Sequence, residues 1–267
     1  MEKREKVREN IADKCTRIGG NKFRNLGNRK QDKKKKIETT PEEFRKAYLF
    51  LYNIFQWVGF IYVLVILAIR YAKEGPNSMA DSYKILGPVM KFLHLLQILE
   101  IIHPLLNYTG GDWRYPALHV GYKLFMIFMM IDAEPRMQVK PVVFYLFLLY
   151  TMVEVAKYPY YLLRVFRVNI SSLTWLRHTV WIPLFPLTFV CEGVILLRNI
   201  PYLEETGVYS LLLPNPYNFS FHLPTFVRLY LILGFFPFMW LTMNRMYHQR
   251  VRHVGPKSWQ DDMDKSD

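Results

Sequence analysis

The chain has 267 residues, of which 51% are hydrophobic and 16% aromatic, and its formal net charge is +13. This apolar content is high for a water-soluble domain. Its two cysteines, Cys15 and Cys191, exclude a disulfide framework, and no cysteine–histidine spacing fits a zinc site. We expect no cleavable signal peptide, because the first 30 residues contain no apolar segment.

Residues 1–46 form a strongly basic polar segment that includes four consecutive lysines at 33–36. This composition predicts a disordered or partly helical cytosolic tail that is attracted to anionic lipid. A nucleic-acid-binding arm is the alternative, but no nucleic-acid-binding module follows, and we expect no nucleic-acid partner. A second, short polar tail is predicted at residues 251–267.

Residues 47–250 contain six apolar stretches that are long enough, or nearly long enough, to cross a bilayer as helices. They are residues 47–72, 85–106, 116–131, 141–163, 174–197 and 224–247. The sequence therefore predicts an all-α polytopic membrane protein, a six-transmembrane-helix bundle. Basic residues before the first stretch, between the fourth and fifth, and after the sixth place both termini in the cytosol. Of three glycosylation sequons, only the one at Asn218 would then be lumenal.

The four middle stretches contain ionisable side chains, which are costly in hydrocarbon and indicate helices that surround a polar site. Glu192 lies deep in the fifth stretch. Glu154 lies in the fourth with Lys157, and it shares a helical face with Tyr150 and Tyr158. The ordinary interpretation is a Glu154–Lys157 pair within one helix of a bundle core. The functional interpretation is a polar pocket between helices.

Four basic side chains are predicted to converge at the cytosolic end of the bundle. They are Lys123, Lys157, Arg177 and His178. A cationic rim above an apolar tunnel suits an acyl-CoA, whose phosphates would lie at the rim, and it suits a phospholipid equally well. Taken singly, Lys123 and Arg177 also fit an ordinary role in which the charged end reaches lipid headgroups.

Four segments spread over residues 47–250 carry a resemblance to a known family. They are LEIIH at 99–103, VEVAKY at 153–158, LFPLTFVCE at 184–192, and the loop at 209–221. In content and order they are similar to segments of the very-long-chain (3R)-3-hydroxyacyl-CoA dehydratases, also known as protein-tyrosine-phosphatase-like membrane proteins. The resemblance implies residence in the endoplasmic reticulum membrane. It also implies the dehydration of (3R)-3-hydroxyacyl-CoA to trans-2-enoyl-CoA in fatty-acid elongation, without a cofactor or metal. The implied partners are the acyl-CoA substrate, membrane lipid and other elongation enzymes.

The family's catalytic pair is a Tyr and a Glu seven residues apart on the fifth helix, which serve as acid and base. Seven residues are two helical turns, so the two side chains share a face about 10 Å apart along the axis. Here the Glu is Glu192, but Phe185 stands at the Tyr position and lacks the hydroxyl. Thr188 likewise replaces a family Gly. Candidate supporting residues are Lys123, Glu154, Lys157, Tyr158, Arg177 and His178.

Two functions stay open. In the first, the protein is a working dehydratase in which Tyr158, Tyr161 or His178 replaces the missing hydroxyl. In the second, it is a weak or inactive member that binds acyl-CoA or lipid as a membrane scaffold of the elongation machinery. We favour the enzyme because Glu192, Glu154 and the basic rim are present.

Two further functions are disfavoured. A cysteine phosphatase needs an arginine six residues after its cysteine, but Leu197 follows Cys191 and Asn21 follows Cys15 at that spacing. A transporter needs polar side chains in both halves of the membrane, and here they gather toward one side.

Overall fold

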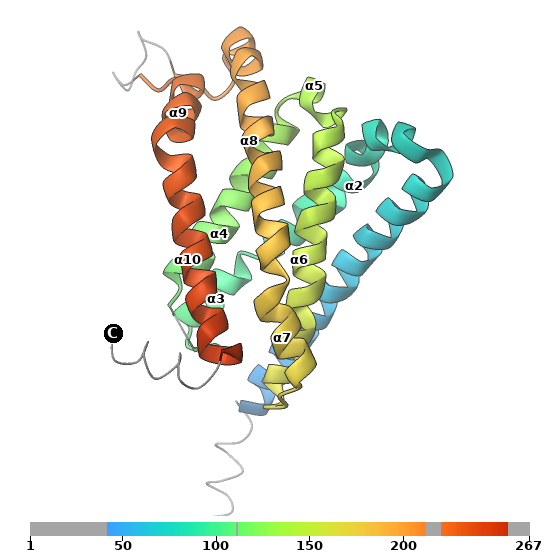
Figure 1. Ribbon diagram of the computed structural model, residues 1–267, viewed down its shortest axis with the longest axis vertical. Helices are drawn as coiled ribbons and strands as arrows, with labels where there is room; N and C mark the ends of the chain where they lie inside the picture. Colours follow the sequence, from blue (N-terminus) through green and yellow to red (C-terminus); the bar gives the residue numbers. More distant parts are fainter. Residues whose placement is uncertain (1–41, 111, 212–219, 256–267) are drawn as a thin grey trace, which may run out of the picture. The chain divides into compact units, whose positions relative to one another are not determined.

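The computed structural model describes residues 42–110, 112–211 and 220–255 (Figure 1). The chain divides into two compact units, Met1–Leu49 and Phe50–Asp267. Within the first unit, residues 42–49 are helical. The predicted basic tail up to residue 41, the sequon at Asn218 and the end of the chain from residue 256 lie outside the described residues.

The described residues are almost entirely helical, with one isolated bridge between Leu211 and Phe221 and no β-strand. A helix over residues 42–74 is followed by η1 (Gly75–Asn77), α2 (Ser78–Leu96), α3 (Leu99–Leu105), α4 (Arg114–Leu124) and the π-helical η2 (Phe125–Asp132). Next come α5 (Pro135–Gln138), α6 (Pro141–Val165), α7 (Ser171–Thr179), α8 (Trp181–Thr206), α9 (Leu223–Leu229), the π-helical η3 (Tyr230–Gly234) and α10 (Phe235–Val254). The prediction of an all-α fold is confirmed.

Within the described residues, four helical segments are long and apolar enough to cross a membrane. They are Glu42–Leu105, Pro141–Val165, Ser171–Thr206 and Leu223–Val254. The first of them contains two of the predicted spans. The predicted span at 116–131 corresponds to α4 and η2, which follow each other without a break, and it is not among the four. The prediction of a membrane bundle stands at this coarser level, and the count of six spans is not confirmed.

Proline and glycine set the ends of the two helices that carry the site. Helix α6 begins with Pro141 after an extended Lys140, a position where the missing N–H costs no hydrogen bond. Helix α8 continues through Pro186 and Pro201 and ends at Gly207, which adopts a left-handed conformation with φ of 63°. Because α8 extends to Thr206, the charged residues that follow the predicted fifth span are helical as well.

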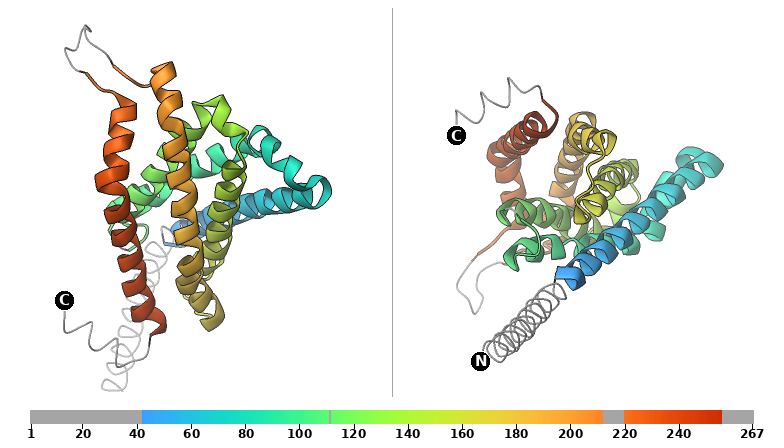
Figure 2. Two further views of the ribbon diagram at one scale, coloured as in Figure 1. Left: turned by 45° about the horizontal axis from the view of Figure 1, so that its top comes forward. Right: turned by 90° about the horizontal axis from the view of Figure 1, so that it is seen from below.

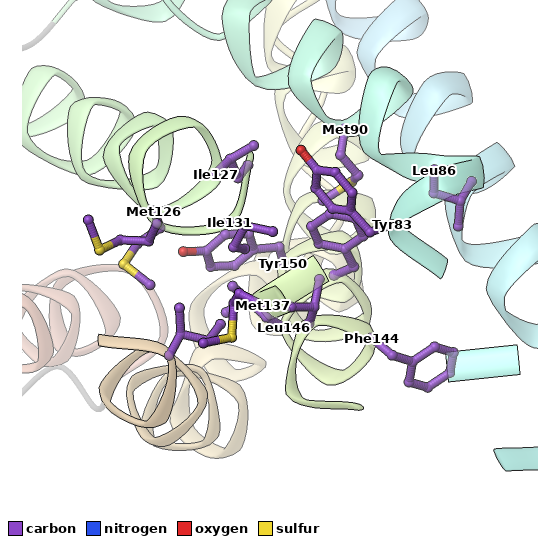
Figure 3. Close-up of a cluster of buried hydrophobic side chains, with 14 of the residues drawn as sticks. Tyr83, Leu86, Met90, Met126, Ile127, Ile131, Met137, Phe144, Leu146 and Tyr150 are labelled. Atoms are coloured by element: carbon purple, nitrogen blue, oxygen red, sulfur yellow. The ribbon is translucent and has the colours of Figure 1, made fainter. Parts of the chain in front are cut away.

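Helices α6 and α8 pack most extensively against each other, and α2 packs on α6. The left view of Figure 2 shows α8 and α10 running alongside each other, with α6 next to α8. A large buried cluster, which includes Phe60, Met90, Ile127, Phe147 and Ile195, fills the space between the helices (Figure 3). A smaller cluster joins the neighbouring parts of α6, α8 and α10, and its members are Leu149, Val153, Trp181, Leu184, Phe185 and Met246. The candidate site is built from residues of both clusters.

Candidate active site

A small cavity lies between α4, α6, α8 and α10. Its volume is about 20 Å³, which is room for about one water molecule. The lining residues are His119, Tyr122, Lys123, Tyr150, Val153, Phe185, Thr188, Phe189, Glu192, Phe238 and Thr242. The sequence therefore brings a carboxylate, an ammonium group and two phenols together in an apolar interior.

Glu192 is the acid of this cavity. Its side chain leaves the middle of α8 and is only 3% exposed. A carboxylate at this depth is costly unless it receives hydrogen bonds. The hydroxyl of Tyr150 on α6 supplies one, with 2.6 Å between its oxygen and Oε1 of Glu192. Glu192 thus has a neutral donor as its direct partner.

Phe185 lines the same cavity two turns before Glu192, as the helical spacing predicts. Its ring centroid lies 5.9 Å from that of His119 and 6.3 Å from that of Trp181. Thr188, which lies between Phe185 and Glu192 on α8, donates its hydroxyl to the carbonyl of Leu184 at 2.8 Å. Phe185 therefore presents a hydrocarbon ring, and no hydroxyl, to the cavity.

Behind the cavity, a chain of buried charges connects α4, α6 and α3. Lys123, which lines the cavity, donates to Oε1 of Glu154. The other oxygen of Glu154 lies 2.5 Å from the ammonium of Lys157, which in turn donates to Glu100 at 3.0 Å. Tyr158 also donates to Glu100, at 2.7 Å. The Glu154–Lys157 pair expected within one helix is present, and it is part of a network across three helices.

Arg177 and His178 lie outside the cavity lining, as do Glu154, Lys157 and Tyr158. Arg177 donates to the hydroxyl of Tyr161 at 3.4 Å. His178 stacks on His253 with a centroid distance of 4.6 Å. Of the predicted supporting residues, Lys123 is the one that reaches the cavity. Within the residues that the structure describes, no group of three metal-ligand side chains is placed to hold a metal ion.

Comparison with known proteins identifies the family. The family described as protein tyrosine phosphatase-like protein, PTPLA, matches residues 94–256, which contain the whole cavity lining. The chain belongs to this family. No solved structure matches the chain.

Several curated PTPLA-like relatives are named as dehydratases. The chain is 34% identical to the very-long-chain (3R)-3-hydroxyacyl-CoA dehydratase of Gallus gallus over 216 residues, which are 81% of this chain and 59% of that protein. It is 33% identical to dehydratase 3 of Homo sapiens, over 82% of this chain and 61% of that protein. It is 29% identical to dehydratase 4 of Bos taurus, over 79% of this chain and 90% of that protein. The chain thus spans about three fifths of the first two relatives.

In this PTPLA member, the sequence did not predict the hydrogen bond between Tyr150 and Glu192. Tyr150 lies four residues before Glu154, so the helical period places both on one side of α6. That period does not indicate which neighbouring helix this side meets. Tyr122, Phe238 and Thr242 also line the cavity, but the sequence did not predict it, because aromatic and hydroxyl side chains are common in apolar stretches.

Proposed function

We propose that the protein dehydrates (3R)-3-hydroxyacyl-CoA to trans-2-enoyl-CoA in very-long-chain fatty-acid elongation. The observation that carries this proposal is the placement of Glu192, a buried carboxylate at the family's catalytic position, in a cavity with a phenol and an ammonium group. Membership of PTPLA and the names of the relatives support the reaction type.

The residues of the cavity fit the chemistry of the elimination. The carboxylate of Glu192 takes the proton from C2, and the electron pair of that C–H bond becomes the C2=C3 double bond. The C3–O bond breaks, and the departing hydroxyl takes a proton from a second, acidic group and leaves as water; the proton held by Glu192 then returns to that group. Negative charge that develops on the thioester oxygen is stabilised by Lys123, the cation in the cavity lining.

The size of the cavity fits the small product and not the whole substrate. A volume of about 20 Å³ accepts one water molecule, whereas sites for molecules of cofactor size measure roughly 300–1,000 Å³. Acyl-CoA binding therefore requires the helices around the cavity to separate. The π-helical segments η2 and η3 adjoin α4 and the α9–α10 segment, and π-helical turns within helices are frequent at functional sites.

The substitution Glu192→Gln tests the function. Purified protein in detergent should convert a long-chain (3R)-3-hydroxyacyl-CoA to the enoyl-CoA, measured by mass spectrometry. Glu192→Gln should lower the rate by about 10²–10⁴-fold or more, because the amide cannot take a proton. Glu204→Gln is the matched control, since Glu204 is on the same helix but pairs with Arg228 at the surface. A folded wild-type protein without turnover above background would contradict the proposal.

The alternative function is that of a weak or inactive acyl-CoA-binding scaffold, and Phe185 is the observation that favours it. In that case the wild-type protein binds 3-hydroxyacyl-CoA without converting it. The substitution Phe185→Tyr would then create dehydration where there was none. Comparison of binding and turnover in the two proteins distinguishes a scaffold from an enzyme.

The same proposal includes six spans in the endoplasmic reticulum membrane with both termini cytosolic. Two contacts support a crossing by α4 and η2. Arg136, just after η2, pairs with Glu205 at the end of α8 at 2.5 Å. The ring centroid of Tyr115, at the start of α4, lies 4.3 Å from the guanidinium carbon of Arg245, near the end of α10. Since α8 and α10 run in opposite directions, the two ends of α4–η2 lie at opposite ends of the bundle (Figure 1).

A further inference from the structure

We propose that Tyr150 supplies the proton-transferring hydroxyl that Phe185 lacks. This inference rests on the proposed dehydratase function. Tyr150 lines the cavity together with Phe185 and Glu192, and its hydroxyl donates directly to Glu192. The second catalytic group of this protein is therefore placed on α6, next to the helix on which the family carries it.

The position of Tyr150 is fixed by its surroundings. The residue is only 2% exposed, and the ammonium of Lys123 lies 5.0 Å from its ring centroid. Figure 3 shows the ring beside Ile131, with the hydroxyl oxygen directed toward Met126 and away from Phe144. A phenol held in this way has one ionisable atom at a defined place in the cavity, and it can act as a general acid for a substrate hydroxyl that binds within hydrogen-bond reach of it.

Other hydroxyls of the cavity are placed less well. The hydroxyl of Thr188 donates to the backbone of Leu184, and alkyl hydroxyls such as that of Thr242 are much weaker acids than phenols. Tyr122 is the remaining phenol of the lining, and its ring packs on Phe238 at a centroid distance of 5.0 Å. Tyr122 also lies close enough to interact with Glu192, but the direct 2.6 Å bond is made by Tyr150, and the experiment below compares the two.

The replacements suggested by the sequence also lie elsewhere. Tyr158 donates to Glu100, Tyr161 accepts from Arg177, and His178 stacks on His253. These three side chains lie outside the cavity lining. They are therefore excluded as the partner of Glu192 in the present arrangement of helices.

The proposed pair completes the proton balance of the elimination. Glu192 receives the C2 proton as the double bond forms, and Tyr150 gives its hydroxyl proton to the departing 3-hydroxyl, which leaves as water. The enzyme is then left with a carboxylic acid and a phenolate in direct contact. The proton returns from Glu192 to Tyr150 along their hydrogen bond, and both groups are restored without a co-reactant.

The test measures kcat and KM for Tyr150→Phe with a long-chain 3-hydroxyacyl-CoA. We expect kcat to fall by about 10²–10⁴-fold with little change in KM, because the hydroxyl acts in the transition state. Tyr83→Phe is the matched control, because the Tyr83 hydroxyl also donates to a carboxylate, that of Asp132, at 2.5 Å, but lies outside this cavity. It should leave kcat within about threefold of the wild type.

A double variant tests the role of the hydroxyl itself. Adding Phe185→Tyr to Tyr150→Phe restores a phenol at the family's position, and we expect kcat to recover by about tenfold or more. Recovery would separate a lost proton donor from lost packing. Incorporation of fluorotyrosine at position 150 covers the case in which the Phe variant does not fold. This more acidic phenol of similar shape should move the alkaline limb of the pH–rate profile to lower pH.

Three outcomes would overturn the assignment of Tyr150 while the dehydratase function stands. One is a Tyr150→Phe enzyme with a kcat close to that of the wild type when Glu192→Gln is inactive. Another is a large loss in Tyr122→Phe without one in Tyr150→Phe. The third is an unchanged pH–rate profile with fluorotyrosine. A wild-type protein that makes no enoyl-CoA would instead contradict the proposed function, so the two failures are distinguishable.

Discussion

Glu154 is the residue on which the buried charges around the site depend. It is 1% exposed, and both of its oxygens lie against ammonium groups, those of Lys123 and Lys157. Lys157 has a second carboxylate partner in Glu100, whereas the ion pair of Lys123 is with Glu154. The two lysines therefore differ in what they lose when Glu154 is neutralised.

This difference gives a prediction for stability. Glu154→Gln should lower the free energy of unfolding by roughly 3–5 kcal/mol, because it leaves Lys123 buried without its carboxylate. Adding Lys123→Met removes that stranded charge while Lys157 keeps Glu100, so the double variant should be more stable than Glu154→Gln alone. Unfolding in detergent micelles measures both. Losses that simply add would show that the two side chains are not coupled.

At the same scale, the sequence predicted that Glu192 and Phe185 share a helical face, and both line one cavity, because spacing on one helix fixes relative direction. The pairing of Glu154 with Lys157 followed from spacing in the same way. The contact between Tyr150 and Glu192 joins residues 42 positions apart on two helices. Such a contact depends on how α6 and α8 rotate against each other, which no pattern within one helix encodes.

Among the elements, the short α5 connects the end of η2 to the end of α8. Glu134 accepts from the backbone of Arg136 at 3.1 Å and from its Nε at 2.7 Å, and Arg136 also donates to Glu205. The guanidinium lies 4.1 Å from the ring centroid of Tyr202 on α8. The Arg136 hydrogen bonds hold the pKa of Glu134 below its usual value of 4.5. Glu134 and α5 lie outside the four candidate spans.

The lowered pKa predicts a pH-dependent contribution to stability. A carboxyl group with a depressed folded-state pKa stabilises the fold above the unfolded value, and the contribution is lost as the pH falls through the folded value. Glu134→Gln should therefore lower Tm by roughly 2–4 °C at pH 7. The difference from the wild type should shrink as the pH falls below 4.5 and disappear once the pH is below the folded-state pKa. A difference that is constant from pH 7 to pH 3.5 would contradict this cause.

The element boundaries show where a hydropathy pattern is and is not sufficient. The predicted span at 141–163 matches α6 closely, because an extended Lys140 and Pro141 mark its start. The predicted span at 174–197 is divided into α7 and α8, and Pro183 suits the first turn of α8, where no N–H is needed. The π-helical turns of η2 and η3 have no counterpart in the prediction, since they carry the same apolar composition as an α-helix.

For the whole molecule, the path of α4 and η2 decides between four and six crossings. If these segments cross, the turn after α3 and the turn after η2 lie on opposite sides of the membrane. Single cysteines at Thr109 and at the exposed Val139, in a background without Cys15 and Cys191, report on the two turns. In sealed microsomes an impermeant maleimide should label position 109, and position 139 only after permeabilisation. Labelling of both from the same side would contradict six spans.

At this scale the sequence predicted the fold class and the family, because both depend on distributed features such as apolar stretches and segment order. It did not predict that the basic rim would separate, with Lys123 at the cavity while Arg177 and His178 contact other residues. The direction of these side chains around the helix axis was not predicted, because Arg177 and His178 belong to α7, which is divided from α8.

The bond between Tyr150 and Glu192 joins two helices, so its length depends on how α6 and α8 lie against each other. Two groups on a single helix keep their separation however the bundle tilts. Tyr150 and Glu192 remain in contact only while α6 and α8 hold their longitudinal register, and a sliding of a few ångströms separates oxygens that now lie 2.6 Å apart. Helices respond to a change in bilayer thickness by tilting against their neighbours. If Tyr150 and Glu192 act together as proposed, the rate of dehydration should depend on the thickness of the bilayer around the protein.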